Sequence, residues 1–200
     1  MYSFLALGDS YTVGEQVPLH HSFPYLCTQL LRDRGIAMAA PEIVAVTGYT
    51  TDELNTLIAE TRLLPPYDLV TLLIGVNNQY RGRSAASFQP EFEQLLQQAI
   101  TFSGNRKKHV VVLSIPDWGV TPFGASKDPV KIAEEIDQYN SVCAAVALEA
   151  GIHFINITEN QRADGALEAF LASDQLHPSG KEYAKWAREL ADYAEPLFKV

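Results

Sequence analysis

The chain is poor in cysteine: its 200 residues include only Cys27 and Cys143, which lie far apart. Their spacing matches no metal-binding or redox motif. Because Cys27 belongs to an apolar pattern of helical spacing, we expect both thiols to be buried as small hydrophobic side chains. No group of histidine, cysteine and carboxylate residues has the spacing of a metal site either, so the sequence predicts no metal and no cofactor.

Long hydrophobic runs are also missing. No apolar stretch approaches the roughly 20 residues that a membrane-spanning helix needs, so no transmembrane segment is expected. The first predicted strand begins at Tyr2, which leaves no room for a signal peptide. If Met1 is the native start, we therefore expect a cytoplasmic protein.

Positive charge is scarce, with 15 Lys and Arg against 24 Asp and Glu and a formal net charge of −9. Phosphate-rich partners would be repelled, which argues against nucleic acid and anionic membrane surfaces. Nucleotide-binding signatures are absent as well, because no Gly-Lys-Ser/Thr loop and no Gly-x-Gly-x-x-Gly follows a strand. Phosphoryl transfer with Asp9 as the nucleophile would require a second aspartate two positions later, where this chain has Tyr11. The expected partner is a small molecule, and the sequence leaves the oligomeric state open.

What the chain does contain is a regular alternation of apolar, β-branched runs and helical patterns. We expect strands at Tyr2–Leu7, Glu42–Val46, Leu69–Ile74, His109–Ile115 and His153–Ile157. Helices are expected at Ser22–Arg34, Thr51–Glu60, Pro90–Phe102, Pro129–Ala150 and Ser179–Leu197. Because a helix follows each strand, the pattern predicts right-handed βαβ units and an α/β fold. We expect a three-layer α/β/α sandwich with a doubly wound, flavodoxin-like, five-stranded parallel sheet, forming one domain over residues 1–200.

The first strand, in "YSFLALGDSYTVGE", is apolar without alternation, so it is expected to be buried on both faces. It stops abruptly at Gly8-Asp9-Ser10. Ligands of open parallel sheets bind beyond the carboxyl ends of the strands. The loops expected at that edge are Gly8–Gly14, Thr47–Thr50, Gly75–Gly82, Pro116–Gly124 and the segment Asp174–His177.

Ser10 becomes a nucleophile only if a base takes its proton, and histidine is the usual base. His177 follows Asp174 by three residues, a spacing that puts both side chains on one face of a turn. The carboxylate can then orient one ring nitrogen while the other faces outward. The remaining histidines are expected in a solvated turn or at the amino-terminal edge of the sheet: His20, His21, His109 and His153.

Two further loops carry candidate hydrogen-bond donors. Gly48 follows the second strand, where a bare backbone N–H can approach a ligand closely. Asn77 and Asn78 follow the third strand. A side-chain amide here can donate to a developing oxyanion, an effect worth roughly 3–4 kcal/mol. Taken one at a time, Gly48, Asn77 and Asn78 are equally consistent with ordinary turns in which they only stabilise the local backbone.

The ordered set of these short motifs resembles the SGNH hydrolases, also called GDSL-type esterases. Gly8-Asp9-Ser10 is similar to the nucleophile block and Gly48 to the glycine block. Gly75-Val76-Asn77-Asn78 is similar to the asparagine block, and Asp174-Gln175-Leu176-His177 to the terminal Asp-x-x-His block. The resemblance spans residues 8 to 177, with all four blocks in order at predicted strand ends.

The resemblance implies a catalytic triad in which Ser10 attacks, His177 acts as general base and acid, and Asp174 orients the imidazole. It also implies an oxyanion hole formed by the Ser10 and Gly48 N–H groups and the Asn77 side chain. One position departs from the family pattern, which usually has Asp where this chain has Asn78. The departure puts the support of Asn77 in question.

The leading hypothesis is a serine esterase that cleaves a small carboxylic ester through an acyl-enzyme. Tyr11, Tyr80 and Trp118 are the candidate substrate-binding residues, and Arg81 and Arg83 are candidates for contact with an anionic leaving group. Without a long lid insertion, we expect short acyl chains. Two alternatives stay open: a lysophospholipase or thioesterase that uses the same triad, and a catalytically silent binding module on the same fold.

Overall fold

The computed structural model describes residues 1–199, which form a parallel five-stranded sheet in the order β2-β1-β3-β4-β5. This order confirms the predicted flavodoxin-like, doubly wound α/β fold. All the predicted strands occur, and each end lies within two residues of its predicted position. Their bounds are Phe4–Gly8 for β1, Glu42–Ala45 for β2, Leu69–Leu73 for β3, Val110–Leu113 for β4 and His153–Ile155 for β5.

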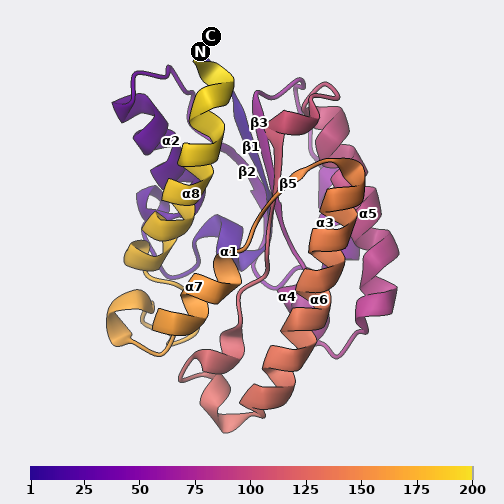
Figure 1. Ribbon diagram of the computed structural model, residues 1–200, viewed down its shortest axis with the longest axis vertical. Helices are drawn as coiled ribbons and strands as arrows, with labels where there is room; N and C mark the ends of the chain where they lie inside the picture. The colour runs from indigo at the N-terminus through magenta and orange to yellow at the C-terminus, as the bar shows by residue number, and fades with distance from the viewer. Residues whose placement is uncertain (200) are drawn as a thin grey trace.

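Helices cover both faces of the sheet (Figure 1). On one face lie α2 (Phe23–Asp33) and α8 (Gly180–Phe198), and on the other lie α3 (Thr51–Glu60), α5 (Ala85–Phe102) and α6 (Pro129–Ala150). Shorter helices are α1 (Ser10–Val13), α4 (Val76–Tyr80) and α7 (Ile157–Asp164). Single 3₁₀ turns are η1 (Leu19–His21), η2 (Lys107–His109), η3 (Trp118–Val120), η4 (Gly124–Ser126) and η5 (Glu168–Phe170).

The core lies between the sheet and its two helical layers. Every residue of β1 is buried, as expected for a strand covered on both faces. Cys27 and Cys143 are buried and unpaired, which confirms their prediction as core residues. Within residues 1–199, no helix combines the length and the apolarity that crossing a bilayer requires.

One helix start differs by several residues from its prediction. Helix α5 begins at Ala85 rather than Pro90, because the Ser84 hydroxyl caps it and the buried Phe88 ring packs on Tyr139 at 4.6 Å. These interactions outweigh the backbone hydrogen bond that Pro90 cannot donate. Helix α3 begins at Thr51, as predicted; Thr50 caps it, and the Glu53 carboxylate accepts a 2.9 Å hydrogen bond from the Thr50 N–H.

The sheet has its topological switch point between β1 and β3, from which the chain continues to β2 on one side and to β4 on the other. Because the chain turns in opposite directions after these strands, their following segments separate and leave a crevice at the carboxyl edge. The segments that border this crevice are α1 after β1, residues 46–50 after β2, and α4 after β3. The fold thus brings three of the four sequence blocks to one place.

Candidate active site

Ser10 stands at the first position of α1, immediately beyond β1. A side chain at Gly8 is impossible, since a Cβ atom there would lie 2.1 Å from Thr12 Oγ1 and 2.4 Å from the Leu73 carbonyl oxygen. Asp9 caps the helix by accepting a 3.0 Å hydrogen bond from the Tyr11 N–H. The close packing around Gly8 and the cap formed by Asp9 together fix the position of the Ser10 hydroxyl at the end of β1.

The structure brings Ser10, His177 and Asp174 into one hydrogen-bonded row. The Ser10 Oγ lies 2.9 Å from His177 Nε2, although 167 residues separate them in sequence. On the other side of the ring, His177 Nδ1 lies 2.6 Å from Asp174 Oδ2. Ser10 and His177 are both buried. This geometry allows proton transfer from the hydroxyl to the imidazole.

Asp174 is held by the turn that carries His177. Its second oxygen, Oδ1, accepts 3.0 Å hydrogen bonds from the N–H groups of Leu176 and His177. Burial would raise the pKa of the Asp174 carboxyl, but the hydrogen bonds from the His177 ring and from these N–H groups outweigh it and lower the pKa. Gln175 adopts a φ of 58° to close the turn. Asp174 is therefore a carboxylate fixed in orientation beside the ring.

Ser10, Gly48 and Asn77, which carry the three expected oxyanion donors, line one pocket. Within residues 1–199, neither the Ser10 N–H nor the Gly48 N–H donates to a protein acceptor. Asn77 Nδ2 donates to the Tyr49 carbonyl at 3.0 Å and lies 3.4 Å from Asp9 Oδ2. These bonds hold the Asn77 amide at the crevice between β1 and β3.

Next to these donors lies a pocket of about 230 Å³. Its lining is mostly apolar and consists of Ser10, Tyr11, Thr47, Gly48, Val76, Asn77, Tyr80, Trp118, Phe123, Leu176 and His177. The Trp118 ring packs edge-on to Tyr80 at 5.3 Å and to Phe123 at 6.1 Å, forming an aromatic wall. Tyr80 is the open part of this wall, with 54% of its surface exposed.

The predicted substrate residues differ in their positions. Tyr80 and Trp118 both line the pocket. Tyr11 lines it too, but it is only 3% exposed and its ring packs at 5.0 Å from the His177 ring and at 6.5 Å from Trp186. The Tyr11 ring therefore packs against the His177 imidazole and exposes little surface to a ligand.

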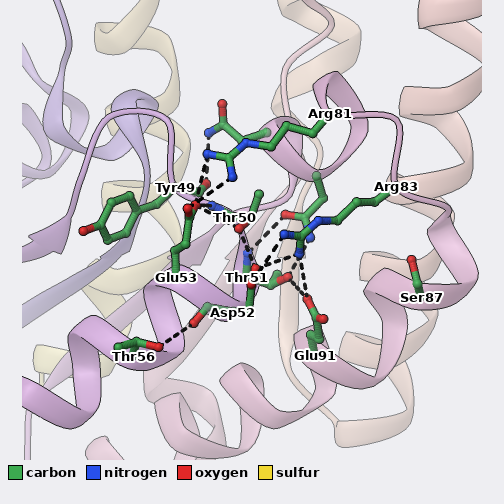
Figure 2. Close-up of polar contacts among 12 residues, drawn as sticks. Tyr49, Thr50, Thr51, Asp52, Glu53, Thr56, Arg81, Arg83, Ser87 and Glu91 are labelled. Carbon is green, nitrogen blue, oxygen red and sulfur yellow. Dashed lines mark hydrogen bonds and ion pairs between the residues drawn. The ribbon is translucent and has the colours of Figure 1, made fainter.

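Arg81 and Arg83 do not project freely toward the pocket. Figure 2 shows both guanidinium groups reaching from the segment after α4 to carboxylates on α3. Arg81 pairs with Glu53 at 3.1 Å and Arg83 pairs with Asp52 at 2.7 Å. Their charges are thus compensated within the protein.

Asn78 contacts α3 and makes no bond to the Asn77 side chain. Its Oδ1 accepts from the Thr51 N–H at 3.1 Å, and its Nδ2 donates to Thr51 Oγ1 at 2.7 Å. Thr51 Oγ1 in turn donates to the Glu91 carboxylate. The amide at this position therefore joins α4 to the start of α3 through both of its polar atoms.

Sequence reasoning missed Gln79, which supports the aromatic wall. Gln79 Oε1 accepts from Trp118 Nε1 at 2.7 Å, and Gln79 Nε2 donates to Glu135 on α6 at 2.7 Å. No local pattern signals this role, because Trp118 lies 39 residues away in sequence. Leu176, which also lines the pocket, lies inside the Asp-x-x-His block, so a local pattern does point to it.

Within the described part of the chain, no group of His, Cys, Asp or Glu residues is arranged to hold a metal ion.

Asp9 gives the site a pH-dependent feature. Burial raises the pKa of its carboxyl to about 7, against the opposing effect of the hydrogen bond from the Tyr11 N–H. The folded state holds this proton more tightly than the unfolded state. The contribution of the protonated Asp9 to the free energy of unfolding is therefore fully present at acid pH and is lost as pH rises toward about 7.

We therefore expect Asp9→Asn to gain stability relative to the unsubstituted protein as pH rises from about 4 to about 8. The Asn oxygen can still cap the Tyr11 N–H. Urea unfolding of both proteins across this range measures the difference. A difference in unfolding free energy that stays constant with pH, or that moves in the opposite direction, would contradict a raised Asp9 pKa.

Comparison with known proteins gives one family and many similar structures. The model of the GDSL-like Lipase/Acylhydrolase family matches residues 6–191. No curated protein sequence matches the chain. Three similar structures are TesA, a lipase/acylhydrolase from Enterococcus faecalis, and Axe2, an acetylxylan esterase from Geobacillus stearothermophilus.

TesA is 20% identical with a TM-score of 0.74, and the match covers 98% of this chain and 99% of TesA. The Enterococcus faecalis protein is 20% identical with a TM-score of 0.76, over 100% of this chain and 98% of that chain. Axe2 is 19% identical with a TM-score of 0.74, over 96% and 94%. At these identities the likeness shows a shared fold.

Proposed function

Because the chain belongs to the GDSL-like lipase/acylhydrolase family and is a carboxylic ester hydrolase of that family, we propose that it cleaves a small ester through an acyl-enzyme on Ser10. The observation that carries this proposal is the contact of 2.9 Å between Ser10 Oγ and His177 Nε2. The 2.6 Å contact of His177 Nδ1 with Asp174 completes the requirement for a base of defined orientation.

In this proposal, the Ser10 oxygen attacks the acyl carbonyl carbon while His177 Nε2 takes the hydroxyl proton. The resulting oxyanion accepts hydrogen bonds from the N–H groups of Ser10 and Gly48 and from Asn77 Nδ2, which gives up its long 3.4 Å contact with Asp9 Oδ2. The tetrahedral intermediate then expels the alcohol, to which His177 returns the proton. A water molecule, activated by His177 in turn, releases the acid from Ser10.

The size of the pocket favours a short acyl group. Its volume of about 230 Å³ lies below the roughly 300–1,000 Å³ of pockets for drug-sized ligands. Trp118, fixed by Gln79, closes one side of it. The exposed Tyr80 ring at the mouth suits stacking against a sugar, and one structural neighbour is an acetylxylan esterase. We therefore rank acetyl and short-acyl esters, including acetylated sugars, as the preferred substrates.

A panel of substrates tests this order. We expect kcat/KM to be highest for acetyl and butyryl p-nitrophenyl esters or an acetylated xylooligosaccharide, and to fall for the octanoyl ester. A higher kcat/KM for a long-chain acyl thioester or for a lysophospholipid would assign the alternative activities. If all the esters stayed intact and a fluorophosphonate failed to label Ser10, the chain would instead be a catalytically silent binding module.

Tyr80→Ala tests the mouth of the pocket. Because Tyr80 is 54% exposed, its truncation should leave the melting temperature nearly unchanged. We expect KM for the preferred ester to rise by roughly tenfold, corresponding to about 1.4 kcal/mol of lost aromatic contact. Steady-state kinetics measure the change, and Tyr25→Ala, on α2 and away from the pocket, is the matched control. Equal KM values for both variants would remove Tyr80 from the substrate site.

A further inference from the structure

Three side chains from α4 and the segment after it hold the loop that carries Gly48. Asn77 Nδ2 donates to the Tyr49 carbonyl at 3.0 Å, and Asn78 Oδ1 accepts from the Thr51 N–H. Arg81 Nη2 donates to the Gly48 carbonyl at 2.7 Å. Of the three, only Arg81 contacts the candidate oxyanion glycine itself.

Nothing packs against Gly48 where a side chain would stand. Its φ is +85°, and a Cβ atom added there would meet no atom within 4 Å. Hydrogen bonds must therefore set the direction of the Gly48 N–H. The peptide that contains this N–H lies between two anchored carbonyl groups, since the Val46 oxygen accepts from the Tyr49 N–H at 3.2 Å and the Gly48 oxygen accepts from Arg81.

Arg81 is itself held in place by a forked ion pair. Its Nη1 lies 3.1 Å from Glu53 Oε1, and its Nη2 lies 3.1 Å from Glu53 Oε2. Glu53 also accepts from the Thr50 N–H, and hydrogen bonds from Thr50 and then from Arg81 lower the pKa of its carboxyl. The Arg81 side chain is 43% exposed, so it adds little to the core.

We propose that Arg81 is a positioning residue that holds the Gly48 N–H toward the oxyanion, an inference that rests on the proposed ester hydrolysis. The guanidinium donates to the Gly48 carbonyl from a fixed support on α3. With the carbonyl on one side of Gly48 held in this way, the N–H on the other side keeps its direction toward the crevice at Ser10. The role requires the planar fork of arginine, because a single ammonium nitrogen cannot span both Glu53 oxygens and the Gly48 carbonyl as the two guanidinium nitrogens do.

Arg81→Ala should lower kcat by roughly ten- to a hundredfold, less than the loss of about 10²–10³ when an oxyanion donor is deleted outright. KM should change by less than about threefold, because the ground-state carbonyl gains little from the hole. Binding of a trifluoromethyl ketone, which forms an oxyanion on the serine, should weaken by the same factor as kcat/KM. Arg81→Lys should keep the charge and still lose most of the rate.

Arg83→Ala is the matched control, because Arg83 also pairs with an acidic residue of α3 but makes no contact with Gly48. It should retain kcat within about twofold. Equal losses in the two alanine variants, full activity of Arg81→Lys, or a change confined to KM would overturn the positioning role and leave the esterase proposal standing. No ester turnover by the unsubstituted protein would overturn the esterase proposal and this inference together.

Discussion

Replacing Ser10 with alanine is expected to reduce kcat for an acetyl or butyryl ester by about 10⁶-fold, while the melting temperature stays nearly unchanged. The hydroxyl is the only group in the row that can form the acyl-enzyme, so its removal leaves catalysis to the oxyanion donors and binding alone. The substitution removes one hydrogen bond to His177 Nε2 and fits the buried space that serine occupies. Chromogenic ester assays and thermal unfolding measure the two effects.

The control for this variant is Ser173→Ala. Ser173 directly precedes Asp174, and its hydroxyl donates a 3.3 Å hydrogen bond to Gln16. It therefore lies beside the triad but makes no hydrogen bond to the His177 imidazole. Its kcat should match that of the unsubstituted protein. Residual turnover near the unsubstituted level in Ser10→Ala would refute Ser10 as the nucleophile, and the other serines would then need to be tested in turn.

Asp174→Asn has the second-largest expected effect, a loss of about 10⁴-fold in kcat of the size seen for the equivalent change in a serine protease. The Asn oxygen can still accept from the Leu176 and His177 N–H groups, so the turn is retained. Its amide, however, would face His177 Nδ1 as a donor and would place the ring proton on Nε2. In that tautomer the imidazole cannot accept the Ser10 proton. Kinetics on the same esters measure the loss.

The pH dependence of stability gives an independent readout for Asp174→Asn. Because the folded state lowers the pKa of Asp174, its carboxylate stabilises the protein above the ordinary carboxyl pKa, and this contribution is lost as pH falls through the lowered value. The variant should therefore be less stable at neutral pH, and the difference should shrink in acid. Asp137→Asn, an exposed partner of Arg162, is the control. A kcat within about tenfold of the unsubstituted protein would exclude the orienting role.

The fold was predictable because its signals are local. The non-alternating run of β1 indicates burial on both faces, and Gly151, which ends α6 with a φ of 72°, stands where the predicted helix stops. The start of α5 was not predictable in this way. Pro90 argues against a helix there, and the packing of Phe88 against Tyr139, from a distant helix, together with the Ser84 cap, outweighs that signal.

The candidate site divides in the same way. Asp174 and His177 could be paired from sequence because three residues separate them, and the position of Ser10 follows from the end of β1. The bond from Trp118 to Gln79 and the bond from Arg81 to Gly48 join parts of the chain that no sequence pattern links.

By itself, the sequence determined the alternation of strands and helices and which polar residues stand at the strand ends, because hydrogen bonding and side-chain burial over a few residues govern both. The tertiary structure alone decided that an oxygen and a ring nitrogen 167 residues apart lie 2.9 Å from each other. It also decided how large a pocket remains beside them. Both outcomes depend on how the segments that follow four strands pack against the turn that carries His177, which is a property of the whole packed chain.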